Sequence, residues 1–192
     1  YRMAVLVMTA FFVLVALVST LVIRSNIRHI TEVWSPSLEY LQELETMTAK
    51  YRIKQYQHLV ESDAAAMATC EKENDNIESQ IKDATAKLGE IINSNKKAQQ
   101  GKADYEKATS AWEEYLSTSD EVYKLSRDNK QAEAAKIMIG SAYESYMSFV
   151  KQLNTLHDDF QVELDNAKTL ANICTIIIFI VIIVTGIAIA VV

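Results

Sequence analysis

The sequence predicts an all-α protein: an up-down-up-down four-helix bundle continuous with two transmembrane helices. Uncharged apolar runs of membrane-spanning length lie near both ends of the 192-residue chain. Between them, apolar residues recur at spacings of three and four, which keeps them on one face of a helix. The chain has one proline and four glycines, far below the average usage of roughly 5% and 7%. Helix breakers this scarce predict long, uninterrupted helices.

The two apolar runs set the predicted domain boundaries. We expect residues 1–23 to form a first transmembrane helix, residues 24–170 an extracytoplasmic four-helix bundle, and residues 171–192 a second transmembrane helix. A cleaved signal peptide is the competing interpretation of the first run, but the run is longer than a signal core and no small-residue cleavage pattern follows it. Arg24 and Arg28 come just after this run, where they would meet lipid headgroups.

The clearest helical pattern lies in the last third of the chain, residues 135–192. Its apolar residues follow a four-three rhythm, the signature of a coiled-coil-like seam: Ala135, Ile139, Ala142, Tyr146, Phe149, Leu153, Leu156, Phe160, Leu164, Ala167 and Ala171. No proline separates this seam from the uncharged residues 173–192. We therefore predict one unbroken helix from about residue 131 into the membrane, able to carry a displacement from water into lipid.

The first bundle helix is predicted to end near residue 62. Ser35-Pro36 fits an N-cap followed by a proline at the first helical position, or a kink if the helix continues from the first membrane span. Ser62-Asp63 is a turn-and-cap signal for the second helix. The expected buried seam of that helix is Met67, Cys70, Asn74, Ile77, Ile81, Ala84, Leu88 and Ile91.

A polar loop over residues 93–101 precedes the third helix, and a short turn over residues 127–130 precedes the fourth. The expected seam of the third helix is Tyr105, Ala108, Trp112, Tyr115, Ser119 and Val122. The first and fourth helices would each be about 60 Å long at about 1.5 Å per residue. Because the connections are short, neighbouring helices should be antiparallel, and both membrane spans should leave from the same end of the bundle.

Charge and motif content exclude several classes of function. All 25 acidic residues lie between the two apolar runs, and the net charge is −6, which argues against nucleic acid as a partner. The histidines His29, His58 and His157 lie far apart in the sequence, and none has a metal-ligand spacing with another histidine or cysteine. No Ser-His-Asp set or phosphate loop can be assembled. We therefore predict no enzymatic activity, no metal site and no cofactor.

Two stretches resemble a known family. WEEYLSTSD at residues 112–120 looks like the third helix of the four-helix-bundle sensor module of bacterial methyl-accepting chemotaxis receptors, and LSRDNKQAEAAK at residues 125–136 is similar to the turn and alanine-rich start of its fourth. Tyr51-Arg52, followed by a polar turn, also matches that family's first helix in kind. The resemblance covers the whole chain.

The resemblance implies a multi-pass receptor of the cytoplasmic (inner) membrane with its sensor domain periplasmic or extracellular. It implies a homodimer that binds a small-molecule ligand outside the cytoplasm and signals to cytoplasmic proteins through a region beyond the second span. The same module also precedes histidine kinases and nucleotide cyclases, so those outputs stay open.

One band of the bundle is polar where the seams are otherwise Leu, Ile and Ala. Counting residues along each helix places seven side chains near one height: Tyr51, Arg52, Gln55, Asn74, Tyr115, Tyr143 and Tyr146. Arg52 and Arg127 are the only arginines of the upper bundle. The planar fork of arginine suits carboxylates, and tyrosines supply apolar walls with a hydroxyl group. The band predicts a pocket for a small organic anion or an aromatic acid, either at a dimer face or inside the bundle.

Two other interpretations of this band stay open. Tyrosines at seam positions commonly belong to the core, and an arginine on a helix commonly pairs with an acid or faces water. Tyrosine and arginine are also enriched at protein interfaces. The chain could therefore be a membrane-anchored helical protein-interaction module.

Overall fold

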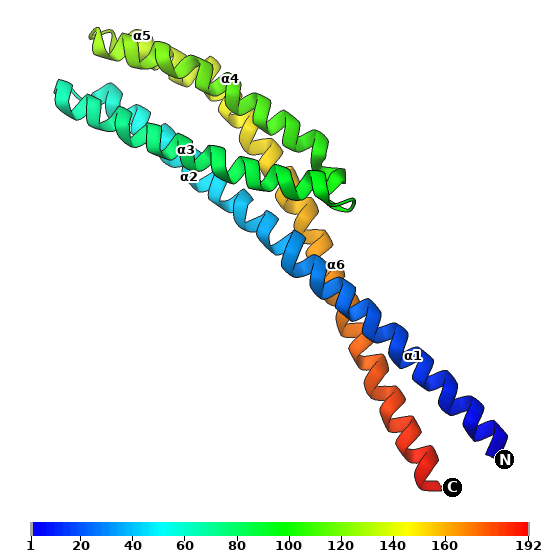
Figure 1. The fold of residues 1–192 in the computed structure, drawn as a ribbon. Helices are drawn as coiled ribbons and strands as arrows, with labels where there is room; N and C mark the ends of the chain where they lie inside the picture. Colours follow the sequence, from blue (N-terminus) through cyan, green and yellow to red (C-terminus); the bar gives the residue numbers. More distant parts are fainter. Residues whose placement is uncertain (1, 192) are drawn as a thin grey trace. The chain divides into compact units, whose positions relative to one another are not determined.

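The computed structural model describes the backbone of residues 2–191 and the side chains of Met3 and residues 7–188. All regular elements within these residues are helical, as Figure 1 shows. In chain order they are α1 (Arg2–His29), a π-helical turn (Ile30–Trp34), α2 (Ser35–Val60), α3 (Ala64–Ser94), a 3₁₀ turn (Ala98–Gly101), α4 (Lys102–Arg127), α5 (Gln131–Ile139) and α6 (Ser141–Val191). The predicted all-α class is confirmed.

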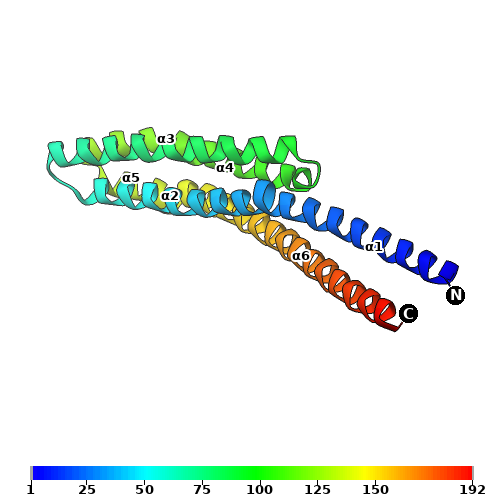
Figure 2. The ribbon, with the colours of Figure 1, turned by 60° about the horizontal axis from the view of Figure 1, so that its bottom comes forward.

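The chain divides into two compact units, Pro36–Phe160 and Tyr1–Ser35 with Gln161–Val192. The first unit is a four-helix bundle of α2, α3, α4 and a fourth helix made of α5 and the first part of α6. Short connections join these helices, so consecutive helices run antiparallel (Figure 2). The predicted up-down-up-down bundle is confirmed. The second unit contains α1, the π-helical turn and the rest of α6.

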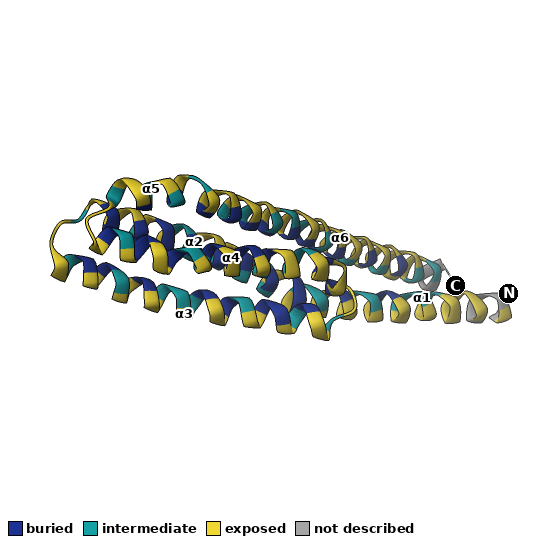
Figure 3. Ribbon diagram, turned by 90° about the horizontal axis from the view of Figure 1, so that it is seen from above, coloured by how far each residue is buried: buried dark blue, intermediate teal, exposed yellow. Residues whose placement is uncertain are grey.

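Apolar side chains from every helix form the core of the bundle. Buried residues follow one face of each helix in Figure 3. They include Leu41 and Leu44 of α2, Ile81, Leu88 and Ile92 of α3, Trp112, Tyr115 and Val122 of α4, and Phe149, Leu153, Leu156 and Phe160 of α6. Full burial of such a side chain stabilises the fold by about 1.5–3 kcal/mol.

The predicted seams of the second and third helices are largely confirmed. Three positions differ: Ile77, Ile91 and Tyr105 are half-buried, whereas Ile92 is fully buried. The shift from Ile91 to Ile92 fits the drift between a strict four-three rhythm and the 3.6-residue turn of a straight helix.

The fourth bundle helix is broken at Gly140, so the prediction of one helix from residue 131 onward is wrong. α5 ends at Ile139 and α6 begins at Ser141. Gly140 has φ −100° and ψ −113°, outside the helical region. A Cβ atom at this position would lie 2.8 Å from the carbonyl oxygen of Lys136. The break therefore depends on the missing side chain of glycine.

The break shifts the buried face of the fourth helix by one residue. In α5 the buried residues are Ala134 and Met138. Of the predicted seam residues, Ala135 is half-buried and Ile139 is 67% exposed. After the break the predicted rhythm holds: Ala142, Phe149, Leu153, Leu156, Phe160, Leu164 and Ala167 are buried, and Tyr146 and Ala171 are half-buried.

The chain stays helical through Pro36. Ser35 has φ −63° and ψ −47°, so the N-cap interpretation, which needs extended backbone, is wrong. The turn before it, Ile30–Trp34, is π-helical. Proline has no N–H to donate to the carbonyl four residues earlier, and one turn of π-helix accommodates such an interruption. The alternative of a continuous but irregular helix is the correct one.

The turn chemistry predicted at the far end of the bundle is confirmed at Asp63. Its Oδ2 accepts a hydrogen bond of 3.0 Å from the backbone N–H of Ala66 and caps the start of α3. The turn between α4 and α5 contains Asn129 at φ 58°, in the left-handed region that asparagine tolerates.

Two helical stretches of the described chain are long and apolar enough to cross a membrane, Val7–Val60 and Gln131–Ala188. Only 6% and 11% of their most apolar windows are buried. The core helix of a soluble protein would bury most of such a window, so exposure favours two membrane spans. α1 continues through residues 23 and 24 and α6 through residues 170 and 171 without a break. The domain boundaries placed there stay predictions.

Candidate functional site

Arg52 lies in α2 with only 9% of its surface exposed. Its guanidinium carbon lies 5.2 Å from the ring centroid of Tyr56, 5.8 Å from Tyr115, 5.4 Å from Tyr143 and 5.0 Å from Tyr146. The negative faces of aromatic rings attract a cation at such distances. We call Arg52 and these four tyrosines the Arg52 cluster.

The guanidinium is only partly satisfied by hydrogen bonds. Nη2 donates to the carbonyl oxygen of Met138 at 2.8 Å and to the hydroxyl of Tyr56 at 2.9 Å. Nη1 is buried, and no residue that the structure describes accepts a hydrogen bond from it. No carboxylate among the described residues forms an ion pair with Arg52 either. The cluster therefore holds a buried positive charge with an unused donor.

A chain of hydrogen bonds continues from the cluster into the core. The hydroxyl of Tyr115 donates to Oε1 of Gln55, whose Nε2 donates to Oγ of Ser119 at 2.8 Å. All three residues are nearly inaccessible to solvent. Burial raises the pKa of Tyr115, and the charge of Arg52 only partly opposes this. Tyr115 therefore keeps its proton and donates a hydrogen bond to Gln55.

Tyr51 and Asn74 belong to a neighbouring arrangement. The ring of Tyr51 packs edge-on against Trp112 and Tyr115, with centroids 5.5 and 6.2 Å apart. Nδ2 of Asn74 donates to the carbonyl oxygen of Tyr51 at 3.1 Å and to the hydroxyl of Tyr123 at 2.5 Å. Burial raises the pKa of Tyr123, so this hydroxyl also stays protonated.

The seven residues predicted from the sequence thus fall into two connected groups. Tyr115, Tyr143 and Tyr146 lie around the guanidinium of Arg52, and Gln55 joins them through its hydrogen bond with Tyr115. Tyr51 joins them through its ring contact with Tyr115, and Asn74 donates a hydrogen bond to the carbonyl oxygen of Tyr51. Ligand binding by these residues stays a prediction.

Sequence reasoning missed four residues of this network: Tyr56, Ser119, Tyr123 and Met138. Tyr56 had a usable signal, because residues four apart lie on the same face of a helix. Met138 had none, since its contact with Arg52 depends on the break at Gly140.

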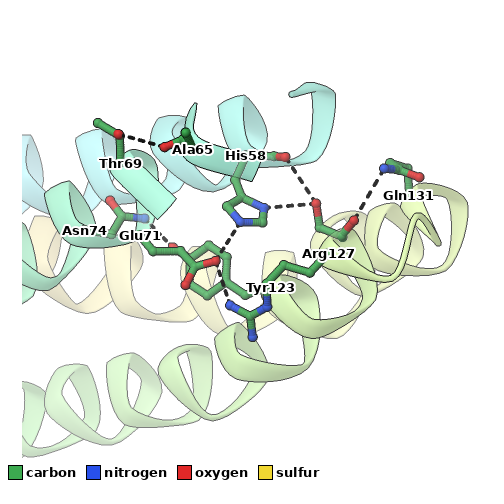
Figure 4. A network of polar contacts seen from close by, with 9 residues as sticks. His58, Ala65, Thr69, Glu71, Asn74, Tyr123, Arg127 and Gln131 are labelled. Atoms are coloured by element: carbon green, nitrogen blue, oxygen red, sulfur yellow. Dashed lines mark hydrogen bonds and ion pairs between the residues drawn. The ribbon is translucent and has the colours of Figure 1, made fainter. Parts of the chain in front are cut away.

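A second polar network, shown in Figure 4, lies where α2, α3 and α4 meet. His58 is fully buried, and its Nε2 donates to Oε1 of Glu71 at 2.9 Å. Arg127 donates to the same oxygen at 2.6 Å. Oγ of Ser126 lies 2.9 Å from Nδ1 of His58 and 3.1 Å from the His58 carbonyl oxygen. Arg127, the other arginine of the upper bundle, is thus paired with a carboxylate, unlike Arg52.

Comparison with known proteins identifies the fold. A family model described as a four helix bundle sensory module for signal transduction matches residues 2–172. The chain belongs to this family. The resemblance inferred from the sequence is therefore confirmed, and the sensory module has a signalling function with no catalytic domain evident in the described residues. A search of curated proteins found no match to the sequence.

Proposed function

We propose that this sensory module is the sensor region of a transmembrane chemoreceptor that binds a small organic anion, an aromatic acid in particular, at the Arg52 cluster. The observation that carries the proposal is a buried arginine with an unused donor and no carboxylate partner among the residues that the structure describes. The module would lie on the outer side of the cytoplasmic membrane, with the two apolar helices as its spans.

Electrostatics supports an anionic ligand. Burying an unpaired charge costs on the order of several kcal/mol, even after the protein relaxes around it. The tyrosine rings and the carbonyl of Met138 offset part of that cost. A ligand carboxylate would accept from Nη1 and neutralise the charge, and arginine favours such planar pairing.

The surroundings of the guanidinium favour a ligand with a ring. Tyr115 and Tyr146 line the inner side, whereas Tyr56 and Tyr143 are 38% and 46% exposed. All four ring centroids lie within 5.8 Å of the guanidinium carbon, so we expect a ligand to reach it by displacing an exposed ring, Tyr56 or Tyr143. An aromatic acid would replace the stacking contacts that such a displacement removes.

Exposed apolar side chains beside the cluster support a homodimer. Ile53, Tyr56 and Val60 follow one face of α2 at spacings of three and four, and Tyr143 and Met147 lie one turn apart on α6. Large apolar residues exposed together commonly mark a protein interface. The proposed anion site would then lie next to the subunit interface.

The path of the signal follows from the helices that meet at Arg52. Arg52 belongs to α2, bonds to a carbonyl of α5 and lies against two tyrosines of α6. α6 is a single helix of 51 residues that includes the second apolar stretch. A ligand with different affinity for two packings of α6 would shift their populations and pass a small displacement along this helix to cytoplasmic signalling proteins.

Calorimetry on the full chain in detergent micelles tests the site. The probes are benzoate, an aromatic monocarboxylate, and succinate, an aliphatic dicarboxylate. We expect benzoate to bind and Arg52→Gln to weaken binding by about tenfold or more. Arg127→Gln is the matched control, because Arg127 is half-exposed and already paired with Glu71. Equal benzoate affinity in the Arg52→Gln and unchanged chains would remove Arg52 from the site.

Disulfide crosslinking tests the signal. Cysteine pairs placed along α2 and the facing part of α6, with Cys70 and Cys174 replaced by serine, should change their crosslinking rates when benzoate is added. Unchanged rates at all pairs would contradict a movement of α6. If no carboxylate binds and a partner protein is recovered with the bundle, the chain is a protein-interaction module instead.

A further inference from the structure

A hollow of about 490 Å³ lies between α3 and α4 of the bundle. Ligand pockets in proteins have volumes of about 300–1,000 Å³. Buried apolar side chains form its floor: Leu44 of α2, Ile81 and Leu88 of α3, Trp112 of α4 and Phe149 of α6. None of the seven residues predicted from the sequence lines it. The hollow therefore reaches the core of the bundle at a place separate from the Arg52 cluster.

The mouth of the hollow carries an excess of negative charge. Glu78, Lys82 and Glu113 line it, and no ion pair among the described residues involves any of the three. Partial burial raises the pKa of Glu78, and the nearby charges of Asp75 and Asp120 raise it further, against the opposing effect of Lys82. Glu78 therefore lies among negative charges that Lys82 does not balance.

The hydroxyl groups at the hollow are already satisfied. Tyr105 donates from its hydroxyl to the carbonyl oxygen of Thr85 at 3.0 Å, and Thr85 donates to Ile81 at 2.7 Å. Thr109 donates to the carbonyl oxygens of Tyr105 and Glu106 at 3.1 and 2.9 Å. Each of these hydroxyl groups already donates a hydrogen bond within the protein. Selection among ligands would therefore come from the apolar floor and from the carboxylates.

We propose that this hollow is a second binding site, which takes a small amphipathic cation. The apolar body of the ligand fills the floor between Ile81, Trp112 and Phe149, and its ammonium group lies at Glu78 and Glu113. Burial of the body provides the affinity, and the charge of the mouth selects the sign of the ligand. The module would then sense two classes of molecule, anions at Arg52 and cations at this hollow.

Three probes that share one body and differ in charge test the site. They are 2-phenylethylamine, 2-phenylethanol and 3-phenylpropionate, each titrated by calorimetry into the full chain carrying Arg52→Gln in detergent micelles, because the acid would otherwise also bind at the proposed Arg52 site. We expect the amine to bind more tightly than the alcohol, and the alcohol more tightly than the acid. Glu78→Gln combined with Glu113→Gln should weaken the amine by about tenfold and leave the alcohol unchanged.

A substitution at the mouth gives an independent test of location. Ala86 is exposed on α3 and lines the hollow, so Ala86→Leu should weaken both the amine and the alcohol by blocking entry. Ala68→Leu is the matched control, because Ala68 is exposed on the same helix five turns earlier and does not line the hollow. Circular dichroism of each variant establishes that the helices remain folded.

Two outcomes would overturn the proposal. One is amine binding that neither the paired glutamines nor Ala86→Leu weakens, which would place the amine elsewhere or in the micelle. The other is no preference for the amine over the acid in the Arg52→Gln chain. The glutamine substitutions change exposed or half-buried side chains, which a folded bundle tolerates. Their effect on amine binding therefore still tests the proposal if the Ala86→Leu variant fails to fold.

Discussion

Nη2 of Arg52 in α2 donates a hydrogen bond of 2.8 Å to the carbonyl oxygen of Met138 in α5. Met138 lies two residues before Gly140, where the helix is interrupted: Gly140 donates to Lys136, and the next bond across the break runs from Glu144 to Gly140. A helical carbonyl ordinarily accepts from the N–H four residues later. The carbonyl oxygen of Met138 instead accepts a hydrogen bond from the buried guanidinium of Arg52. This contact places a positive charge at the carboxyl end of α5, where the helix dipole favours it.

This relationship predicts that Gly140→Ala destabilises the bundle. The new Cβ would lie 2.8 Å from the carbonyl oxygen of Lys136, a backbone atom that moves only with the helix. We expect the free energy of unfolding to fall by about 1–3 kcal/mol, as for other overpacked sites. Urea denaturation followed by circular dichroism measures it. Gly186→Ala is the control, since no atom of the described residues lies within 4 Å of its added Cβ; an equal effect of the two substitutions would contradict the role given to Gly140.

Gln55 predicts a second stability effect inside the proposed anion site. Gln55→Leu keeps a similar volume but leaves the hydroxyls of Tyr115 and Ser119 without their partner. Buried polar groups without partners cost about 1–3 kcal/mol each, so the midpoint of urea denaturation should fall. Gln57→Leu, two residues later on the exposed side of α2, should change stability by about 0.5 kcal/mol or less. A larger loss at Gln57 than at Gln55 would contradict the hydrogen-bond chain.

The sequence predicted the fold well because its seams are long and regular. Leu41, Leu44, Leu153 and Leu156 repeat at spacings that only a helix places on one face, and all four are buried. The height of Arg52 relative to Tyr146 followed from counting residues along rigid helices. Such counting works where helices are unbroken.

Features that depend on tertiary contacts were not predictable in this way. In the sequence, the four-three spacing of apolar residues continues through Ala135 and Ile139 and across Gly140. In the structure the helix is interrupted at Gly140, and the buried residues before it are Ala134 and Met138 instead. Likewise, His58 had no sequence neighbour that identified Glu71 as its partner, because α2 and α3 meet there only after the chain reverses at residues 61–63.

His58 predicts a stability effect that distinguishes it from the other histidines. It is fully buried, packs edge-on against Tyr123 with centroids 4.9 Å apart and bonds to Glu71. His58→Ala removes these contacts and leaves a cavity, so the free energy of unfolding should fall by about 3 kcal/mol. His157→Ala, at a half-exposed side chain, should stay within about 0.5 kcal/mol of the unchanged chain. Equal unfolding midpoints for the two variants would contradict the structural role of His58.

The ion pairs of Glu71 predict a loss of stability in acid. Burial raises the pKa of Glu71, but hydrogen bonds from His58 and Arg127 outweigh this and hold it below its ordinary value of 4.5. The unfolded chain, in which Glu71 has its ordinary pKa, therefore binds this proton more readily than the folded chain. The stabilisation is fully present above pH 4.5 and is lost as the pH falls through the lower pKa of the folded state.

Two glutamine variants with opposite signs check this prediction. Glu71→Gln should lower the free energy of unfolding at neutral pH, and the difference from the unchanged chain should shrink as the pH falls below 4.5. Glu78 has the opposite shift, because burial and the charges of Asp75 and Asp120 raise its pKa. Its ionised form is therefore disfavoured by folding, and Glu78→Gln should raise stability at neutral pH with an advantage that disappears in acid. Urea midpoints measured from pH 7 to pH 3 give both curves, and parallel curves for the two variants would show that the pairing of Glu71 with His58 and Arg127 does not control its titration.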